Sequence, residues 1–190
     1  MKTRESGMPD EKMWDTFFDP EVILDSLGIK NLTGNITDLG CGYGTFTIPA
    51  ARRTNGLVYA IDIEKEMIQI TQEKAKQSGL KNVVAIQRDF IADGTGLADS
   101  CCDLVMLFNI LHAKEPLIIL AETKRILTSE GQVAIIHWIP DPSTPRGPPM
   151  SIRPRPEQIQ NWLKEAGFNL KDKIIPLPPH HYGILGINPA

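Results

Sequence analysis

The residues best able to do chemistry form a glycine-rich turn, DLGCGYG, at positions 38–44. Asp38 precedes Gly40, Gly42 and Gly44, so the glycines are spaced GxGxG, whereas the dinucleotide-binding fingerprint is GxGxxG. Glycines between a first strand and a first helix let a ligand approach the backbone N–H groups at the helix N-terminus. An acid beside the turn repels a pyrophosphate and attracts an ammonium group. The pattern therefore favours an amino-acid-bearing nucleoside over NAD, and a packing cluster of glycines is the structural alternative.

Two further acids end later strands of the same pattern. Asp62 closes the apolar run LVYAID, 18 residues after Gly44, where a carboxylate accepts hydrogen bonds from both ribose hydroxyls. Asp89 ends the next strand in QRDF, where it suits an adenine amino group while Phe90 lies against the ring. Because the carboxyl ends of parallel strands meet at one edge of a sheet, we expect these groups to face one crevice.

Histidine moves protons near neutral pH, and the four histidines of the chain all fall near predicted strand ends. His112 follows the fourth strand, His137 ends the fifth, and His180 and His181 stand in the turn before the last strand. We expect all four beside the same crevice. His137 and the His180/His181 pair are our catalytic candidates, with polar rim residues that only form hydrogen bonds as the alternative.

The elements that must position these residues alternate between short apolar runs and amphipathic segments, which is typical of βαβ units and a parallel sheet. We predict strands at 35–40, 57–62, 82–87, 102–108 and 131–138, and helices at 46–53, 64–78 and 117–127. Gly79 suits the left-handed end of the second helix. The pattern indicates an α/β fold.

Outside this core the pattern changes. Residues 140–156 hold seven of the 15 prolines and cannot form a helix or a central strand. A helix follows at 156–168, and then an antiparallel hairpin of strands 171–177 and 182–187. Asp19 is the expected N-cap of an N-terminal helix. We therefore predict one domain with an N-terminal helical cap (1–34), a cofactor-binding core (35–138), a proline-rich acceptor-side loop (139–156) and a C-terminal helix and hairpin (157–190).

Composition limits the class of protein and its partners. The chain has 190 residues, 42% hydrophobic and 23% charged, which is typical of a globular protein. Its net charge of -3 argues against long nucleic acids, and no apolar run suggests a membrane span or a signal peptide, so we expect a cytoplasmic protein, monomeric or homodimeric. Cys41, Cys101 and Cys102 lack zinc-ligand spacing, so we expect reduced thiols and no metal.

Five ordered segments resemble the class I S-adenosylmethionine-dependent methyltransferases, particularly the small ubiquinone/menaquinone-biosynthesis type. They are DLGCGYG, YAIDIEKEMI, RDF, CDLVMLFNILH and ETKRILTSEGQVAIIHW, and the match as a whole runs from about residue 35 to residue 138. The resemblance implies a Rossmann-like, doubly wound, seven-stranded sheet of order 3-2-1-4-5-7-6 with strand 7 antiparallel. Ser129 and Glu130 replace the family's usual Pro-Gly before Gly131, a departure that we expect to affect only a surface turn.

The resemblance also implies roles for individual residues. The glycines would line the methionine end of S-adenosylmethionine with Asp38 near its amino group, Asp62 would hold the ribose, and Asp89 with Phe90 the adenine. Asn109 stands where the family's chain passes the methionine moiety. The complete cofactor-binding set that we predict is Asp38, Gly40, Cys41, Gly42, Gly44, Asp62, Ile63, Asp89, Phe90 and Asn109.

The predicted function is methyl transfer to a small-molecule acceptor by in-line displacement. Arg146, Arg153 and Arg155 either attract an acidic acceptor or are solvated charges on a stiff loop. The aromatic residues Trp14, Phe17 and Phe18 either cover the cofactor as a lid or pack as an ordinary apolar face. An S-adenosylmethionine-binding sensor or partner subunit is one alternative function, and an NAD-binding oxidoreductase is a third. The acceptor atom is left open.

Overall fold

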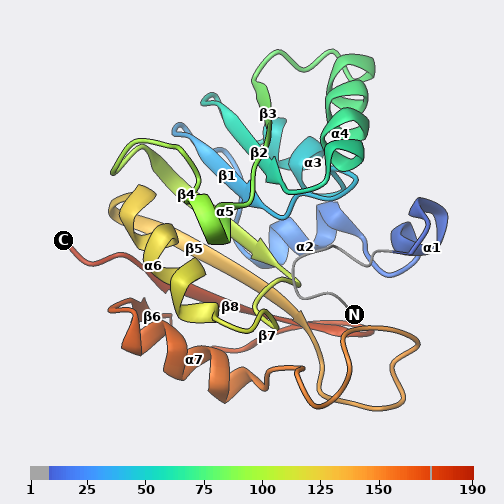
Figure 1. Cartoon of the computed structure of the whole chain (residues 1–190), viewed down its shortest axis with the longest axis vertical. Coiled ribbons are helices and arrows are strands. Elements are labelled where there is room, and N and C mark those ends of the chain that lie inside the picture. Colours follow the sequence, from blue (N-terminus) through green and yellow to red (C-terminus); the bar gives the residue numbers. More distant parts are fainter. Residues whose placement is uncertain (1–8, 172) are drawn as a thin grey trace.

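The computed structural model describes residues 9–171 and 173–190, and strands and helices alternate between residues 36 and 165 (Figure 1). The helices are α1 (Glu11–Asp15), α2 (Pro20–Ser26), α3 (Thr47–Ala51), α4 (Lys65–Gln77), α5 (Phe90–Asp93), α6 (Pro116–Ile126) and α7 (Pro156–Glu165). The strands are β1 (Ile36–Leu39), β2 (Val58–Asp62), β3 (Val83–Gln87), β4 (Cys102–Phe108), β5 (Leu127–Trp138), β6 (Asn169–Leu170), β7 (Ile175–Leu177) and β8 (His181–Ile187). Every element predicted between 35 and 138 is confirmed in type.

One sheet has the strand order β3-β2-β1-β4-β5-β8-β6, and β7 also pairs with β8. Neighbouring strands from β3 through β5 are parallel, while β8 runs antiparallel to β5, β6 and β7. This topology confirms the predicted Rossmann-like α/β fold, including the antiparallel final strand. All four residues of β1 are buried, as expected for a strand that is covered on both faces.

The penultimate strand differs from the single strand expected at 171–177. Two short strands, β6 and β7, pair with β8 instead, which gives the sheet eight strands. Leu170 lies opposite Gly186 and Ile175 lies opposite Gly183, so five steps along one chain match three along the other. Because the two surplus residues cannot join the hydrogen-bond ladder, the strand is divided.

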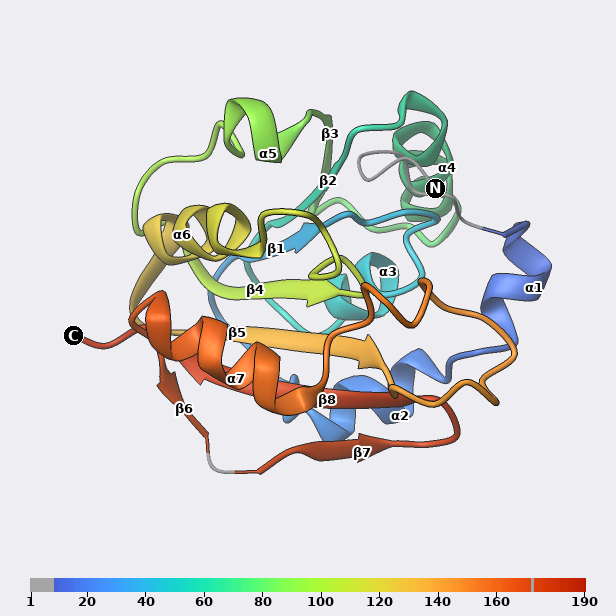
Figure 2. The ribbon, with the colours of Figure 1, turned by 60° about the horizontal axis from the view of Figure 1, so that its bottom comes forward.

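Two apolar layers hold helices against the two faces of the sheet. Successive strand residues point to opposite faces. Leu39 therefore joins a core cluster with residues of α5, α6 and α7, whereas Ile36 joins a cluster with residues of α2 and α3. Figure 2 shows α6 and α7 on one side of the sheet and α2 on the other, so the sheet is doubly wound.

The two N-terminal helices take different positions, α2 on one face of the sheet and α1 beside the edge at which the parallel strands end. The carboxylate of Asp19 accepts a 3.2 Å hydrogen bond from the Val22 amide, which confirms Asp19 as the N-cap of α2. Arg53 then ties α2 to the end of α3 through ion pairs with Glu21 and Asp25. Figure 2 shows β4 and β5 pointing toward the side occupied by α1 and the loop after β5.

Candidate active site

A cavity of about 360 Å³ opens at the carboxyl edge of the sheet, a volume typical of small-molecule sites. One end is formed by the turn after β1 and by the ends of β2 and β3, and the other by the segment after β4, by Trp138 and by the loop beyond it. Nine of the ten residues of the predicted cofactor-binding set line it: Asp38, Gly40, Cys41, Gly42, Asp62, Ile63, Asp89, Phe90 and Asn109.

Gly44 does not line the cavity and instead lets two elements pack closely. Its φ is +73°, and a Cβ there would lie 2.9 Å from Oγ1 of Thr71 on α4. That threonine hydroxyl also donates a 2.9 Å hydrogen bond to the Gly42 carbonyl. Gly44 therefore fits a packing role, and its assignment to cofactor binding stays a prediction.

The turn at Gly40 leaves room for a ligand because it has no side chain. Gly40 has a φ of +76°, and a Cβ there would meet Cγ2 of Ile110 at 2.8 Å. Its amide donates a 2.8 Å hydrogen bond to the Ile61 carbonyl, which fixes the turn to the end of β2. Both the backbone conformation and the space thus require glycine at this position.

Asp62 joins the glycine turn to the end of β2. Its Oδ2 accepts a 2.9 Å hydrogen bond from the Gly42 amide, and its Oδ1 accepts one of the same length from the Glu64 amide. Burial raises the pKa of this carboxyl, while these backbone hydrogen bonds act in the opposite direction. Each carboxylate oxygen retains a lone pair, so the group can still accept hydrogen bonds from a ligand hydroxyl in the cavity.

Asp38 is a buried acid whose pKa lies close to the physiological pH range. The Thr47 hydroxyl donates a 2.6 Å hydrogen bond to its Oδ2. Burial raises the pKa of Asp38 to about 7, the Thr47 hydrogen bond opposes that rise, and the nearby charge of Asp62 adds to it. A cation bound beside this carboxyl would favour its ionised form. The site therefore fits the ammonium group that the sequence suggested.

Asp89 fixes the position of the third strand end. Its Oδ1 accepts hydrogen bonds of 3.1 Å from the Ile91 amide and 3.0 Å from the Ala92 amide, so it caps α5. Phe90 is buried and lines the cavity beside it. This placement is compatible with adenine binding, which stays a prediction.

Asn109 supplies the clearest sign that a polar ligand belongs in the cavity. It has a φ of +60°, and neither its side-chain oxygen nor its nitrogen makes a hydrogen bond although both atoms are buried. The hydroxyl of Thr45, which also lines the cavity, is unpaired in the same way. Since buried polar groups are normally hydrogen-bonded, these atoms fit the polar methionine part of S-adenosylmethionine.

The four histidines separate into two groups. His112 lines the cavity, whereas His137, His180 and His181 do not. His180 and His181 pack on Trp138, with ring centroids 5.9 Å and 4.3 Å away. The catalytic role predicted for these three stays a prediction. His112 was expected beside the crevice but was not among the catalytic candidates. It stands four residues beyond the end of β4, in a segment that lines the cavity.

His137 is fully buried behind His112. The two rings meet edge to face with centroids 5.6 Å apart, and neither ring nitrogen of His137 makes a hydrogen bond. Burial lowers the pKa of His137 far below its ordinary value, and the neighbouring His112 lowers it further. Burial also lowers the pKa of His112. Both imidazoles are therefore neutral at pH 7, the form that can accept a proton.

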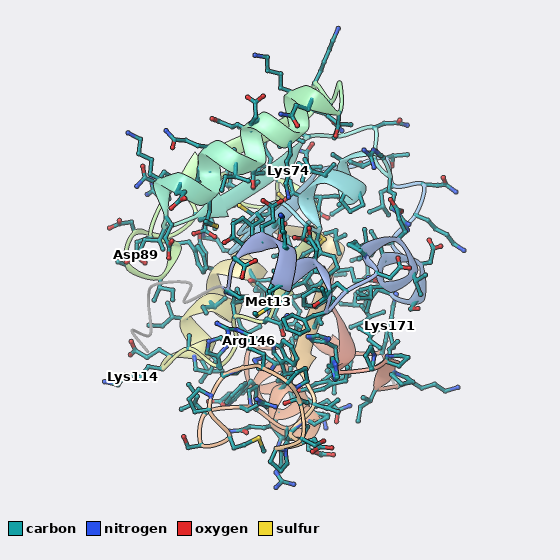
Figure 3. All side chains as sticks on the ribbon, turned by 90° about the vertical axis from the view of Figure 1, so that its right-hand side faces the viewer. Met13, Lys74, Asp89, Lys114, Arg146 and Lys171 are labelled. Atoms are coloured by element: carbon teal, nitrogen blue, oxygen red, sulfur yellow. The ribbon has the colours of Figure 1, made fainter. Side chains whose placement is uncertain are left out.

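The three arginines expected to act together are placed apart. Arg146 is exposed and lines the cavity, Arg155 is exposed and does not, and Arg153 is buried. In Figure 3, Arg146 lies toward the orange loop after β5 and Asp89 toward α4. The aromatic residues of the N-terminus also divide, because Trp14 lines the cavity while Phe17 packs on Trp138 with centroids 5.2 Å apart. Phe18 packs against Phe46 and His181.

Within residues 9–171 and 173–190, no group of three or more His, Cys, Asp or Glu side chains is arranged to hold a metal ion. Cys41 and Cys102 are buried free thiols, and Cys101 is a partly buried free thiol.

None of the described helices is long and apolar enough to cross a membrane.

Comparisons with known proteins identify the family of this chain. A model of the methyltransferase domain family matches residues 31–168. The aklanonic acid methyltransferase DauC of Streptomyces sp. (strain C5) is 29% identical over 143 residues, covering 69% of this chain and 63% of that protein. The uncharacterized protein YbxB of Bacillus subtilis (strain 168) is 29% identical over 92 residues, covering 48% of this chain and 45% of that protein. The matches thus span 45% and 63% of the lengths of these two relatives.

Solved structures give the same result over most of the chain. A SAM-dependent methyltransferase from Aquifex aeolicus superposes with a TM-score of 0.82 at 27% identity, and the match covers 94% of each chain. Geranyl diphosphate methyltransferase in complex with SAM superposes with a TM-score of 0.73 at 14% identity, and the match covers 89% of this chain and 84% of that one. At this low identity the similarity is evidence for a shared fold only. The predicted methyltransferase family is confirmed. The Aquifex aeolicus protein is SAM-dependent, and S-adenosylmethionine is also the cofactor predicted for this chain.

Proposed function

The chain belongs to the methyltransferase domain family, and we propose that it transfers a methyl group from S-adenosylmethionine to a small-molecule acceptor by in-line displacement. The observation that carries the proposal is the cavity itself. It combines the Gly42–Asp62 hydrogen bond, the buried carboxyl of Asp38 and the unpaired amide of Asn109. This set matches a ligand with sugar hydroxyls, an ammonium group and a carboxylate.

When bound, S-adenosylmethionine supplies an electrophilic methyl group on a sulfonium centre. The chain's own residues then have to hold that group, exclude water and deal with the acceptor's proton. Asp62 would hold the ribose, Asp38 the amino group and Asn109 the methionine moiety. These assignments rest on the placement of the three side chains in one cavity.

His112 is the group best placed to accept a proton from an acceptor. It lines the cavity, as do Asn109 and Ala113 of the same segment. Its lowered pKa keeps the ring neutral at pH 7, so it can act as a base if the acceptor atom carries a proton. His137, packed behind it, would act by positioning the His112 ring rather than by touching the acceptor.

A small-molecule acceptor is favoured by the largely apolar far end of the cavity, which includes Trp14, Phe108 and Trp138. The relative DauC is named for an acid, aklanonic acid, and an acidic acceptor is part of our proposal here. We propose that the enzyme acts as a monomer or homodimer.

Calorimetry with S-adenosylmethionine, S-adenosylhomocysteine and NAD tests the cofactor. We expect both sulfur nucleosides to bind and NAD not to bind. Binding of NAD with no response to the other two would overturn the proposal in favour of an oxidoreductase. Binding of S-adenosylmethionine without turnover across a broad acceptor panel would favour a sensor or partner subunit.

Alanine variants test the histidines. His112→Ala should keep the affinity for S-adenosylmethionine and lower turnover by about 10²-fold or more if it acts as a base. His137→Ala, His180→Ala and His181→Ala test the remaining candidates in the same assay. Unchanged turnover in all four variants would exclude histidine catalysis.

A further inference from the structure

The two ends of the cavity differ in charge. Asp38, Asp62 and Asp89 line the cofactor end. Arg146 is the one charged side chain that lines the opposite wall among the residues described, since burial keeps the neighbouring His112 neutral at pH 7. Its guanidinium makes no hydrogen bond or ion pair with any described residue. A cation facing a binding cavity without a protein partner is available to a ligand.

The loop that carries Arg146 is folded around a second arginine. The guanidinium of Arg153 is largely buried and donates hydrogen bonds to the loop at five points: the carbonyls of Ile139, Asp141, Arg146 and Pro148 and the hydroxyl of Thr144. The bond to the Arg146 carbonyl is 3.2 Å long. These contacts define the backbone position from which the Arg146 side chain extends, so the free cation is presented by an ordered loop.

Gly147 brings this loop directly over the aromatic wall. Its φ is +122°, and a Cβ there would lie 2.6 Å from Nη2 of Arg153 and 3.0 Å from Cγ of Trp138. Gly147 and its neighbour Pro148 both line the cavity with Trp138. The cation at Arg146 therefore borders an apolar surface formed by aromatic and proline carbons.

We infer that Arg146 is a specificity-determining residue that binds an oxyanion of the acceptor, either a carboxylate or a phosphate, while the acceptor's apolar body lies against Trp138, Pro148 and Trp14. A guanidinium forms paired hydrogen bonds with both kinds of oxyanion. Arg153 acts as a positioning residue for this contact. The inference rests on the proposed function, because the oxyanion belongs to the molecule that receives the methyl group.

Binding of model compounds tests the inference without requiring turnover. The full chain, saturated with S-adenosylhomocysteine, is titrated by calorimetry with 2-naphthoate, 2-naphthyl phosphate and the neutral 2-naphthamide. We expect at least one anion to bind about tenfold more tightly than the amide. Arg146→Gln should abolish this preference, and Arg146→Lys should keep part of it. Arg155→Gln is the matched control, because Arg155 is an exposed arginine of the same segment outside the cavity, and it should behave as the unchanged protein does.

The outcomes separate this inference from the proposed function. Equal affinity for the amide and both anions, no binding by either anion, or a preference that survives Arg146→Gln would each overturn the inference. Which anion binds more tightly distinguishes a carboxylate acceptor from a phosphate acceptor. A loss of S-adenosylhomocysteine binding in Arg146→Gln alone would assign Arg146 to the cofactor and also overturn it. Failure of the unchanged chain to bind S-adenosylhomocysteine would instead contradict the proposed function.

Discussion

The amide of Gly42 donates a 2.9 Å hydrogen bond to Oδ2 of Asp62, so the glycine turn after β1 and the acid that ends β2 form one unit. The two residues are 20 positions apart in the chain and belong to different strand ends. This hydrogen bond stabilises the conformation of the turn, because the Asp62 carboxylate accepts from the Gly42 N–H, which has no partner within a helix. A ligand bound there meets an already ordered surface, and less of its binding energy is lost in ordering the loop.

Asp62→Asn should therefore weaken both the turn and cofactor binding. The amide nitrogen cannot accept, so one of the two backbone N–H groups now bonded to Asp62 loses its partner, at a cost of about 1–3 kcal/mol. We expect a lower melting temperature and a loss of about tenfold or more in affinity for S-adenosylmethionine, measured by calorimetry. Asp93→Asn, at an exposed acid of α5, is the control and should change neither quantity. An unchanged affinity in Asp62→Asn would show that the carboxylate is not part of the binding site.

Gly40→Ala should destabilise the protein more than a comparable change elsewhere. Gly40 and Gly79 have φ values of +76° and +69°, but only at Gly40 does a Cβ meet another side chain, Cγ2 of Ile110 at 2.8 Å. Gly79→Ala therefore measures the loss of unfolding free energy that comes from the backbone conformation alone, about 1 kcal/mol. In Gly40→Ala, overpacking against Ile110 should lower the free energy of unfolding by about 1–3 kcal/mol more. Denaturant unfolding of both variants gives the difference. Equal free energies of unfolding would mean that Ile110 moves aside without cost.

The sequence predicted the fold well where local pattern and topology agree. The alternating apolar and amphipathic segments from Ile36 to Trp138 identify strands and helices because each face of the sheet is buried. The division of the penultimate strand was not predicted. It depends on the register between Leu170 and Gly186, which no local periodicity encodes.

The candidate site could also be predicted only in part, at the strand ends but not in the loops. Side chains next to strand ends, such as Asp62, could be placed because parallel strands end at one edge of the sheet. The sequence could not show which of Arg146 and Arg153 is exposed, because both stand among prolines in the same segment. Only the folded loop buries Arg153 and leaves Arg146 exposed. His112 depends in the same way on the course of the segment after β4.

The affinity for S-adenosylmethionine should rise with pH through about 7. Asp38 has a pKa raised to about 7 by burial, so below this pH the carboxyl holds a proton that a bound ammonium group must displace. We expect affinity to increase about tenfold from pH 6 to pH 8, with fractional proton release near pH 7, which calorimetry in buffers of different ionisation enthalpy detects. Asp38→Asn, which can still accept from the Thr47 hydroxyl, should bind more weakly and with no such rise. A pH-independent affinity in the unchanged protein would place the ammonium group elsewhere.

His137→Phe should make the protein more tolerant of acid. Burial holds the pKa of His137 well below 6.5, so the folded state keeps the ring neutral while the unfolded chain binds a proton below that pH. The free energy of unfolding therefore falls as pH drops below 6.5, by at most about 1.4 kcal/mol per pH unit for this group. Phenylalanine fills a similar space, has no proton to bind and leaves no unpaired ring nitrogen, so the variant should lose this component of the slope.

Urea unfolding between pH 5 and pH 8 measures that slope. His112 and His181 also have pKa values lowered by burial, the latter to about 3, so the His137→Phe variant should retain part of the acid sensitivity. Gly79→Ala is the control, because it changes stability at an exposed position just beyond the end of α4 without changing a titrating group, and it should keep the full slope. A His137→Phe variant with the same slope as the unchanged protein would mean that His137 is protonated in the folded state, and its neutral role behind His112 would have to be abandoned.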